Sequence, residues 1–505
     1  MSKKSADFIF CLAPLLMLCL GAYWIQTHTY LHKDLAIILD TAEKMLQGET
    51  YGHDIFEPNP PLIFYLNMLP IAITKLTGIK IIYTLRFYLI SLIFISSVSS
   101  FYLFKKIFQP STRMARIMFY ALSFIFLLLP SGAFGQREHL MVVFSTPYIL
   151  LAVCRLSNLS VPQYFAFLMG LMAGIGFSIK PFFLPIYCLI ELFFIYKERN
   201  FWGWVRIESI TALSFILLYN ISVLLFCPVY LHMILPLWMP YYSGIIKPWK
   251  IVLTYPYFVL CCITPFLFFI AHTKTKYTLL HSLLMVTLIG DLISFLIPRV
   301  TWYYHIYPAV AIASLYFVLI LAELYDSRFR QGFKFLLVGW LGSTLLCILV
   351  FNNMILTKEL ITYFNSDSAF KRMLNYLKQK EPNQSYDFFS MTHQLIVLEF
   401  YSTAHYVGSF SFFNWEYYRL SPQLNTQYKD HVLPFIKNTI STDLNNKKPH
   451  YVIVDNPSSL LYLKQPIDFP REYVKHTNFH YAWSQYTHET SIGPYDIYKR
   501  NAYNI

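Results

Sequence analysis

Long apolar runs follow one another along most of this chain of 505 residues, separated by short polar loops. A helix needs about 20 apolar residues to cross the roughly 30 Å hydrocarbon core of a bilayer. The pattern predicts about eleven transmembrane helices, at residues 8–28, 79–104, 117–132, 140–156, 164–178, 182–196, 207–226, 251–271, 279–297, 306–324 and 335–355. We therefore expect an α-helical polytopic membrane protein.

Residues 29–78, between the first two runs, are predicted to form an external loop with two interfacial helices. Residues 35–46 place their apolar side chains on one helical face, which is typical of a helix that lies in the membrane surface. Asp34 stands at the N-cap position and Gly48 at the C-terminal stop. A second short apolar stretch ends at Gly78, and counting it as a span would invert the charge pattern of every later loop.

Beyond residue 356 the hydropathy falls, and helical and strand patterns alternate. The sequence predicts a helix at 368–380 and strands at 450–454, 479–485 and 495–500. We therefore expect two domains, a transmembrane domain at 1–356 and a soluble α/β domain at 357–505. The second domain has no Gly-rich phosphate loop, so no nucleotide cofactor is expected.

The net charge of +13 comes from Lys and Arg dispersed over alternate loops, for example Lys3 and Lys4, Lys105 and Lys106, and Lys197 and Arg199. Short loops rich in Lys and Arg stay in the cytoplasm. This predicts a cytoplasmic N-terminus and an external, periplasmic C-terminal domain in a bacterial inner membrane. Dispersed cations do not form a nucleic-acid surface, so no nucleic-acid partner is expected.

Composition supports the membrane assignment, since 56% of the residues are hydrophobic and only 13% are charged. The eight cysteines lie within or beside the apolar runs. Neither a disulfide framework nor a thiolate metal site is indicated.

With this topology, the ionisable residues of several loops gather at the external face. These residues are Asp34 and Glu57 in the first loop, Arg137, Glu138 and His139 in the second, Lys180 in the third turn, and Arg299 and His305 in the segment PRVTWYYHIYP. Ionisable groups at the edge of a membrane are candidates for function.

Three features of the sequence resemble glycosyltransferases of the GT-C superfamily. They are Asp34 opening a short amphipathic helix, the acidic Pro-rich turn FEPNPP, and the basic Tyr-Pro segment from Arg299 to Pro308. The resemblance is greatest to the branch that contains protein O-mannosyltransferases and the lipid A aminoarabinose transferase. It implies a lipid-phosphate-linked sugar donor, and a role for Asp34 as the base that activates the acceptor. The alternative is that Asp34 only caps the helix.

Glu57 falls at the Glu of the FEKPP-type turn in that branch, where this residue lies at the active site and can help to bind a metal. Here Pro58 replaces the Lys of that turn, and Asn59 is inserted before the Pro pair. The resemblance makes His305 a ligand of a divalent metal ion together with Glu57, or a hydrogen-bond partner of the donor. The alternatives are an exposed loop acid for Glu57 and an aromatic interface belt for His305.

Arg137 and Lys180 are candidate contacts of the donor phosphate, since guanidinium and ammonium groups bind phosphate strongly. The resemblance of the segment from Arg299 to Pro308 implies the same role for Arg299, because a basic residue of this segment approaches the lipid phosphate in that family. Glu138 and His139 belong to the same dense cluster. The alternatives are a salt-bridged loop at 137–139 and a Lys180 that only reaches toward the interface.

The function expected from these residues is transfer of a sugar from a polyprenyl-phosphate donor to a glycan, lipid or protein acceptor in the cell envelope. The C-terminal domain would help to bind or position the acceptor. Two rivals stay open. One is a flippase or transporter of a lipid-linked saccharide, and the other is a non-catalytic assembly subunit.

Overall fold

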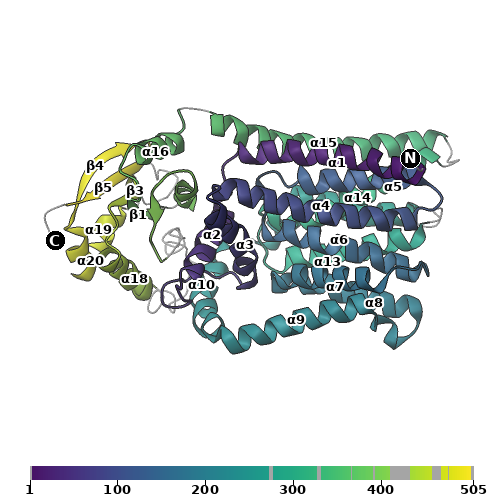
Figure 1. Ribbon diagram of the computed structural model, residues 1–505, viewed down its shortest axis with the longest axis horizontal. Coiled ribbons are helices and arrows are strands. Elements are labelled where there is room, and N and C mark those ends of the chain that lie inside the picture. Colours follow the sequence, from purple (N-terminus) through teal and green to yellow (C-terminus); the bar gives the residue numbers. More distant parts are fainter. Residues whose placement is uncertain are drawn as a thin grey trace. The chain divides into compact units, whose positions relative to one another are not determined.

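A computed structural model of the protein describes residues 3–271, 277–326, 331–364, 367–390, 393–409, 433–457, 468–475 and 477–501 (Figure 1). The chain forms two compact units. The helical unit comprises Met1–His28, Tyr83–Ser222 and Ile246–Leu360, and the mixed unit comprises Thr29–Ile82, Val223–Ile245 and Ile361–Ile505. The first predicted loop therefore belongs to the same unit as the C-terminal region.

Each of the eleven apolar runs falls on a helix. These helices are α1 (Lys3–Thr27), α4 (Ile81–Ile107), α5 (Thr112–Leu127), α6 (Arg137–Leu156), α7 (Gln163–Ser178), α8 (Leu184–Glu198), α9 (Ile207–Phe226), α12 (Pro256–Ala271), α13 (Thr278–Leu296), α14 (Tyr303–Asp326) and α15 (Gln331–Phe364). Within the described residues, five helices, α4, α6, α9, α13 and α14, are long and apolar enough to cross a membrane. The polytopic fold is confirmed, and the number of spans stays a prediction.

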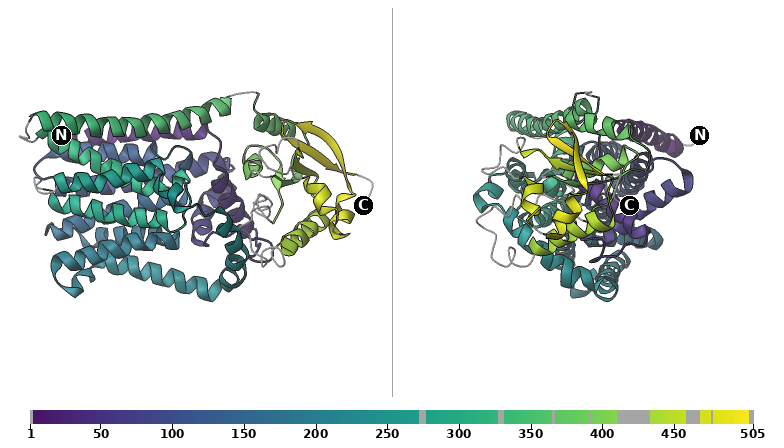
Figure 2. Two further views of the ribbon diagram at one scale, coloured as in Figure 1. Left: turned by 180° about the vertical axis from the view of Figure 1, so that it is seen from behind. Right: turned by 90° about the vertical axis from the view of Figure 1, so that its left-hand side faces the viewer.

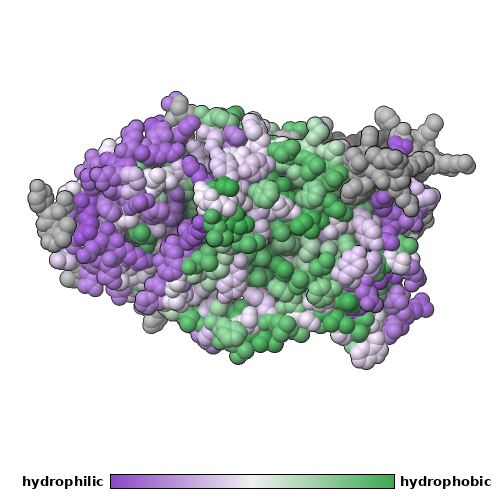
Figure 3. Space-filling view, viewed as in Figure 1, coloured by the Kyte–Doolittle hydropathy of each residue, from purple (hydrophilic) through white to green (hydrophobic). Residues whose placement is uncertain are grey.

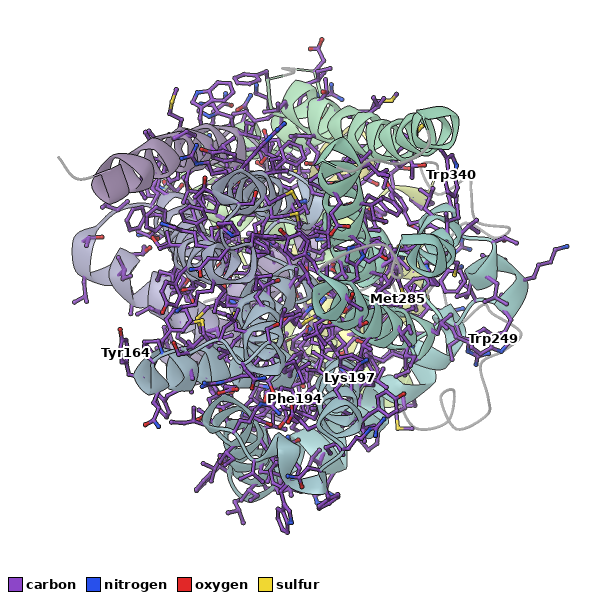
Figure 4. The ribbon with its side chains drawn as sticks, turned by 90° about the vertical axis from the view of Figure 1, so that its right-hand side faces the viewer. Tyr164, Phe194, Lys197, Trp249, Met285 and Trp340 are labelled. Carbon is purple, nitrogen blue, oxygen red and sulfur yellow. The ribbon has the colours of Figure 1, made fainter. Side chains whose placement is uncertain are left out.

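Small residues allow the helices of the helical unit to approach closely. A Cβ atom at Gly170 of α7 would lie 2.3 Å from the carbonyl oxygen of Glu208 in α9. Met285 lies among the helices, whereas Tyr164 and Trp249 lie at their outer edge (Figure 4). The middle of this unit presents a largely hydrophobic surface, as lipid contact requires (Figure 3).

Two helices of the first loop belong to the mixed unit, as expected, and their position in the membrane interface stays a prediction. They are α2 (Lys33–Leu46) and α3 (Leu62–Thr77), which pack against each other. Gly78 ends α3 in the left-handed conformation, with a φ of 70°. The N-cap of α2 is His32, not Asp34 as predicted, because the His32 ring accepts the N–H of Asp34.

The C-terminal region is a small α/β sandwich with a five-stranded sheet, and its surface is largely hydrophilic (Figures 2 and 3). Its elements are α16 (Ala369–Lys378), β1 (Ser385–Phe389), η6 (His393–Phe400), β2 (His405–Tyr406), α18 (Leu433–Asn446), β3 (Tyr451–Asp455), α19 (Phe469–Tyr473), α20 (Thr477–Trp483), β4 (Tyr486–Ile492) and β5 (Tyr495–Arg500). The strand order is β2-β1-β3-β5-β4. Strands β2, β1 and β3 are parallel, and β5 is antiparallel to both of its neighbours, β3 and β4.

Aromatic contacts place helices on both faces of this sheet. Tyr376 of α16 packs on Tyr451, and Trp483 of α20 packs on Tyr498. Tyr498 pairs with Val452, the neighbour of Tyr451, so the two tyrosines point to opposite faces. The sheet is therefore covered by α16 on one face and by α20 on the other.

One of the three predicted strands is wrong. Residues 477–483 form α20, because Phe479 and Ala482 bury one helical face, and β4 begins only at Tyr486. The helix predicted at 368–380 and the strands predicted at 450–454 and 495–500 are confirmed as α16, β3 and β5. The division into domains at 1–356 and 357–505 stays a prediction.

Candidate functional site

Three of the predicted ionisable residues of the helical unit meet at one carboxylate. The Nζ atom of Lys180 lies 2.5 Å from Oε1 of Glu138, and Nδ1 of His305 lies 3.0 Å from the same oxygen. The side chain of Glu138 is 1% exposed and that of His305 is 12% exposed. Pairing of a buried carboxylate with cations offsets part of the cost of burying its charge.

The cluster forms because three helix starts converge in the helical unit. Glu138 lies in the first turn of α6, where the helix dipole favours a carboxylate. Lys180 ends the connection after α7, and Pro181 then starts the short 3₁₀ helix η2 (Pro181–Phe183). His305 lies in the first turn of α14. Residues that are far apart in the sequence are thus brought together by the packing of α6, η2 and α14.

An aromatic side chain that was not among the predicted site residues completes the cluster. The ring of Tyr304 lies 5.9 Å from Cζ of Arg137 and 5.7 Å from Nζ of Lys180. Both distances suit cation–π attraction. The sequence signal was the position of Tyr304 beside His305 at a helix start. We call Arg137, Glu138, Lys180, Tyr304 and His305 the ion cluster.

The ion cluster carries two permanent cations and one carboxylate, so its net charge is positive. Within the described part of the chain, Oε2 of Glu138 accepts no hydrogen bond. Arg137 and Lys180 are both buried. Two cations in a poorly hydrated place attract a phosphate more strongly than they would in water.

His139 has a structural set of contacts. Its Nδ1 accepts the N–H of Gly135 at 2.9 Å, and its Nε2 donates to the carbonyl of Phe126 at 2.8 Å. Both ring nitrogens are therefore used to fix the turn before α6. A part for His139 in the chemistry of the site stays a prediction.

Arg299 belongs to a different group of residues in the helical unit. Its Cζ atom lies 5.1 Å from the ring of Trp249, and its carbonyl accepts the N–H of Lys247 at 3.0 Å. Arg299 has a φ of 49°, which is uncommon for a residue with a side chain. The exposed Lys247 makes this a second basic group.

Asp34 lies in the first turn of α2, and its side chain is 17% exposed. The capping role that would have explained Asp34 without chemistry belongs to His32, whose Nδ1 accepts the N–H of Asp34 at 3.2 Å. The same nitrogen lies 4.0 Å from Oδ1 of Asp34. A partly exposed carboxylate beside an imidazole has the chemistry of a general base.

Glu57 is buried, and its carboxylate accepts a hydrogen bond from Asn59, the residue by which the turn FEPNPP departs from the family pattern. The turn is held by its backbone. Trp238 Nε1 donates to the carbonyl of Phe56 at 2.5 Å, and the hydroxyl of Tyr230 donates to the carbonyl of Pro58 at 3.1 Å. The turn is thus a rigid part of the mixed unit.

The predicted metal ligands Glu57 and His305 belong to different units of the chain. The described partner of Glu57 is Asn59 and that of His305 is Glu138. Within the described ranges, no group of three His, Cys, Asp or Glu side chains is arranged to hold a metal ion. Mg²⁺ is often held by one or two carboxylates together with phosphate groups of the substrate, so a divalent metal ion at Glu57 and His305 stays a prediction.

No protein-family model matches the chain, and no curated protein matches it either. Solved structures do. The crystal structure of ArnT from Cupriavidus metallidurans bound to undecaprenyl phosphate matches with a TM-score of 0.54 at 10% sequence identity, over 98% of each chain. The apo structure of the same ArnT matches with a TM-score of 0.50 at 11% identity, again over 98% of each chain. The chain has the fold of ArnT.

ArnT is the lipid A aminoarabinose transferase and has the GT-C fold. The expected GT-C fold is therefore confirmed, and it extends from the transmembrane helices through the C-terminal sheet. At 10% identity the likeness concerns the path of the backbone, and the roles of the side chains stay predictions.

Proposed function

We propose that the protein is a membrane glycosyltransferase that moves a sugar from a polyprenyl-phosphate donor to an acceptor of the cell envelope. The observation that carries this proposal is the ion cluster, which places two buried cations in a chain that has the fold of ArnT. The solved ArnT structure holds undecaprenyl phosphate, a lipid phosphate of the proposed donor class. The acceptor is a glycan, a lipid or a protein.

Asp34 acts as the base in this proposal. Its carboxylate takes the proton of the acceptor hydroxyl while the oxygen attacks the anomeric carbon of the sugar. The bond between that carbon and the phosphate oxygen breaks, and its electron pair leaves with the polyprenyl phosphate. The products are the glycosylated acceptor, the lipid phosphate and protonated Asp34.

Arg137 and Lys180 stabilise the leaving phosphate, whose negative charge grows as the bond breaks. Fixed cations aimed at developing charge are a major source of rate enhancement. Glu138 and His305 hold Lys180 in place, since Nζ of Lys180 and Nδ1 of His305 share one oxygen of Glu138. Arg299, with Trp249 and Lys247, forms a second basic group that binds donor phosphate or lipid headgroup.

The proposed location is the inner membrane of a bacterium, with the N-terminus in the cytoplasm and the C-terminal domain in the periplasm. The distribution of Lys and Arg over alternate loops supports this orientation. The donor would then be used on the periplasmic side. The same orientation makes a prediction about a reporter enzyme that works only outside the cytoplasm. Fused after residue 505, this reporter should be active.

The test is sugar transfer by membranes that contain the protein, supplied with a panel of polyprenyl-phosphate sugars. Asp34→Asn is compared with the wild type at equal expression, and Asp54→Asn serves as the control because Asp54 is a partly exposed acid of the same loop. We expect near-complete loss of transfer for Asp34→Asn and wild-type transfer for Asp54→Asn. Wild-type protein that transfers sugar from no donor would favour a carrier, and full activity of Asp34→Asn would remove Asp34 from the mechanism.

A further inference from the structure

The segment that carries Asp34 is held on both sides of this residue by the C-terminal region of the same unit. Before Asp34, the hydroxyl of Tyr401 accepts the N–H of Leu31 at 3.0 Å and donates to the carbonyl of Thr29 at 3.1 Å. Tyr401 follows η6, and η6 packs against α2. One side chain thus fixes two backbone groups just ahead of α2, and we call this pair of hydrogen bonds the first clamp.

Aromatic packing supports this first clamp. The ring of Tyr30 lies 5.1 Å from that of Tyr401, 4.7 Å from that of Phe370 and 5.0 Å from that of Tyr363. Such edge-on and tilted ring pairs each add to the energy of burial. The stretch from Thr29 to Leu31 therefore packs, through Tyr30, against three aromatic rings of the C-terminal region.

After Asp34, a buried lysine makes the second clamp. Lys44 is 7% exposed, and its Nζ atom donates to Oδ2 of Asp40 at 2.9 Å and to the carbonyl of Gly408 at 2.8 Å. It also lies 4.6 Å from the centre of the Tyr406 ring. Two polar residues of α2, Asp40 and Lys44, are thus buried, and Lys44 contacts residues of the C-terminal region.

The charge of Lys44 is kept in spite of its burial. Burial alone would lower the pKa of Lys44, but the carboxylates of Asp40 and Glu399 raise this pKa above its usual value. Breaking a buried pair by removing one partner is strongly unfavourable. The ion pair between Lys44 and Asp40 is therefore costly to break, and it keeps Nζ of Lys44 beside the carbonyl of Gly408.

We propose that Tyr401 and Lys44 are positioning residues for Asp34, so that the C-terminal region sets the turnover of the enzyme by fixing both sides of the segment that carries the base. This inference rests on the proposed function. It adds to the expected acceptor binding a second role for the C-terminal region. A base displaced by about 1 Å can lose about 100-fold in rate.

The test uses full-length protein in detergent micelles with Tyr401→Phe, which removes one hydroxyl and keeps the ring. The matched control is Tyr486→Phe. Tyr486 is a buried tyrosine whose hydroxyl donates to the carbonyl of Pro449 at 2.9 Å, within the C-terminal region and away from α2. For Tyr401→Phe we expect kcat to fall about 10- to 100-fold while the KM for the donor changes less than about twofold. For Tyr486→Phe we expect kcat and KM to stay at their wild-type values.

A second readout does not depend on activity. Hydrogen exchange of the backbone amides of residues 29–46 should become faster in Tyr401→Phe and in Lys44→Met, and not in Tyr486→Phe. Unchanged exchange, or unchanged kcat in an active enzyme, would overturn the inference. If the wild type transfers no sugar, the proposed function fails, whereas the exchange of residues 29–46 still decides whether these side chains hold the segment.

Discussion

Replacement of Lys180 by methionine tests the ion cluster most directly. The change keeps the length of the side chain but removes the charge that lies 2.5 Å from Oε1 of Glu138. A unit charge about 4 Å from a phosphate contributes about 4 kcal/mol at an effective dielectric constant near 20. Loss of one fixed group that stabilises developing charge costs about 2.7–4 kcal/mol, or roughly 10²- to 10³-fold in kcat.

The same substitution also affects stability, because Glu138 then keeps His305, at 3.0 Å, and the neighbouring Arg137 as its described partners. Removal of one partner from a buried ion pair costs about 3–5 kcal/mol. The double variant Lys180→Met with Glu138→Gln removes both charges of the pair. It should regain the thermal stability that Lys180→Met loses, but not the activity.

The assay is the initial rate of transfer from a radiolabelled polyprenyl-phosphate sugar, with thermal unfolding measured on the same samples. Lys197→Met is the control, because Lys197 is an exposed lysine in the last turn of α8. Wild-type kcat in Lys180→Met would refute the assignment of this residue to the leaving phosphate. Recovery of kcat in the double variant would show that Lys180 acts only by neutralising Glu138.

Two further predictions concern the pH and the packing. Burial and the neighbouring Asp443 raise the pKa of Asp387 to about 7. The native state therefore binds more protons than the unfolded chain between about pH 4 and 7. As a result, the free energy of unfolding falls as the pH rises through this window. Asp387→Asn should therefore raise the thermal midpoint at pH 8 and not at pH 5, and equal shifts at both pH values would count against it. Gly170→Val should lower the thermal midpoint by several degrees and the free energy of unfolding by about 1–3 kcal/mol, because its Cβ would lie 2.3 Å from the Glu208 carbonyl oxygen. In the control Gly21→Ala the new Cβ meets no atom within 4 Å, so the thermal midpoint should change little.

The helices of this protein could be predicted because lipid imposes one simple condition on them. A run of apolar residues must satisfy its own backbone hydrogen bonds, so every long run becomes a helix. The soluble region follows weaker rules. Residues 479–485 contain aromatic residues that favour strands, yet Phe479 and Ala482 bury a helical face in α20.

The candidate residues were found in the sequence, but their partners were not. Glu138 and His305 are separated by more than a hundred positions, and no local pattern indicates that they share an oxygen with Lys180. His32 took the cap that local spacing had given to Asp34. Lys44 lies outside the apolar face that the pattern predicts for α2, and the pattern does not indicate its burial, because its partner Gly408 lies in a distant part of the chain.

In the proposed mechanism, Glu138 sets the balance between binding and release of the lipid phosphate by the ion cluster. Arg137 and Lys180 would repel each other in a buried place without a carboxylate, and the cost of desolvating two like charges would be large. Glu138 offsets this cost, but its Oε1 also competes with an incoming phosphate for Lys180. Binding the lipid phosphate equally well before and after transfer would not speed the reaction, because only attraction that grows in the transition state does so. Glu138 keeps the two cations in position and weakens their attraction to the phosphate of the bound donor. More of the attraction between the cations and the phosphate therefore appears in the transition state, when the phosphate gains negative charge.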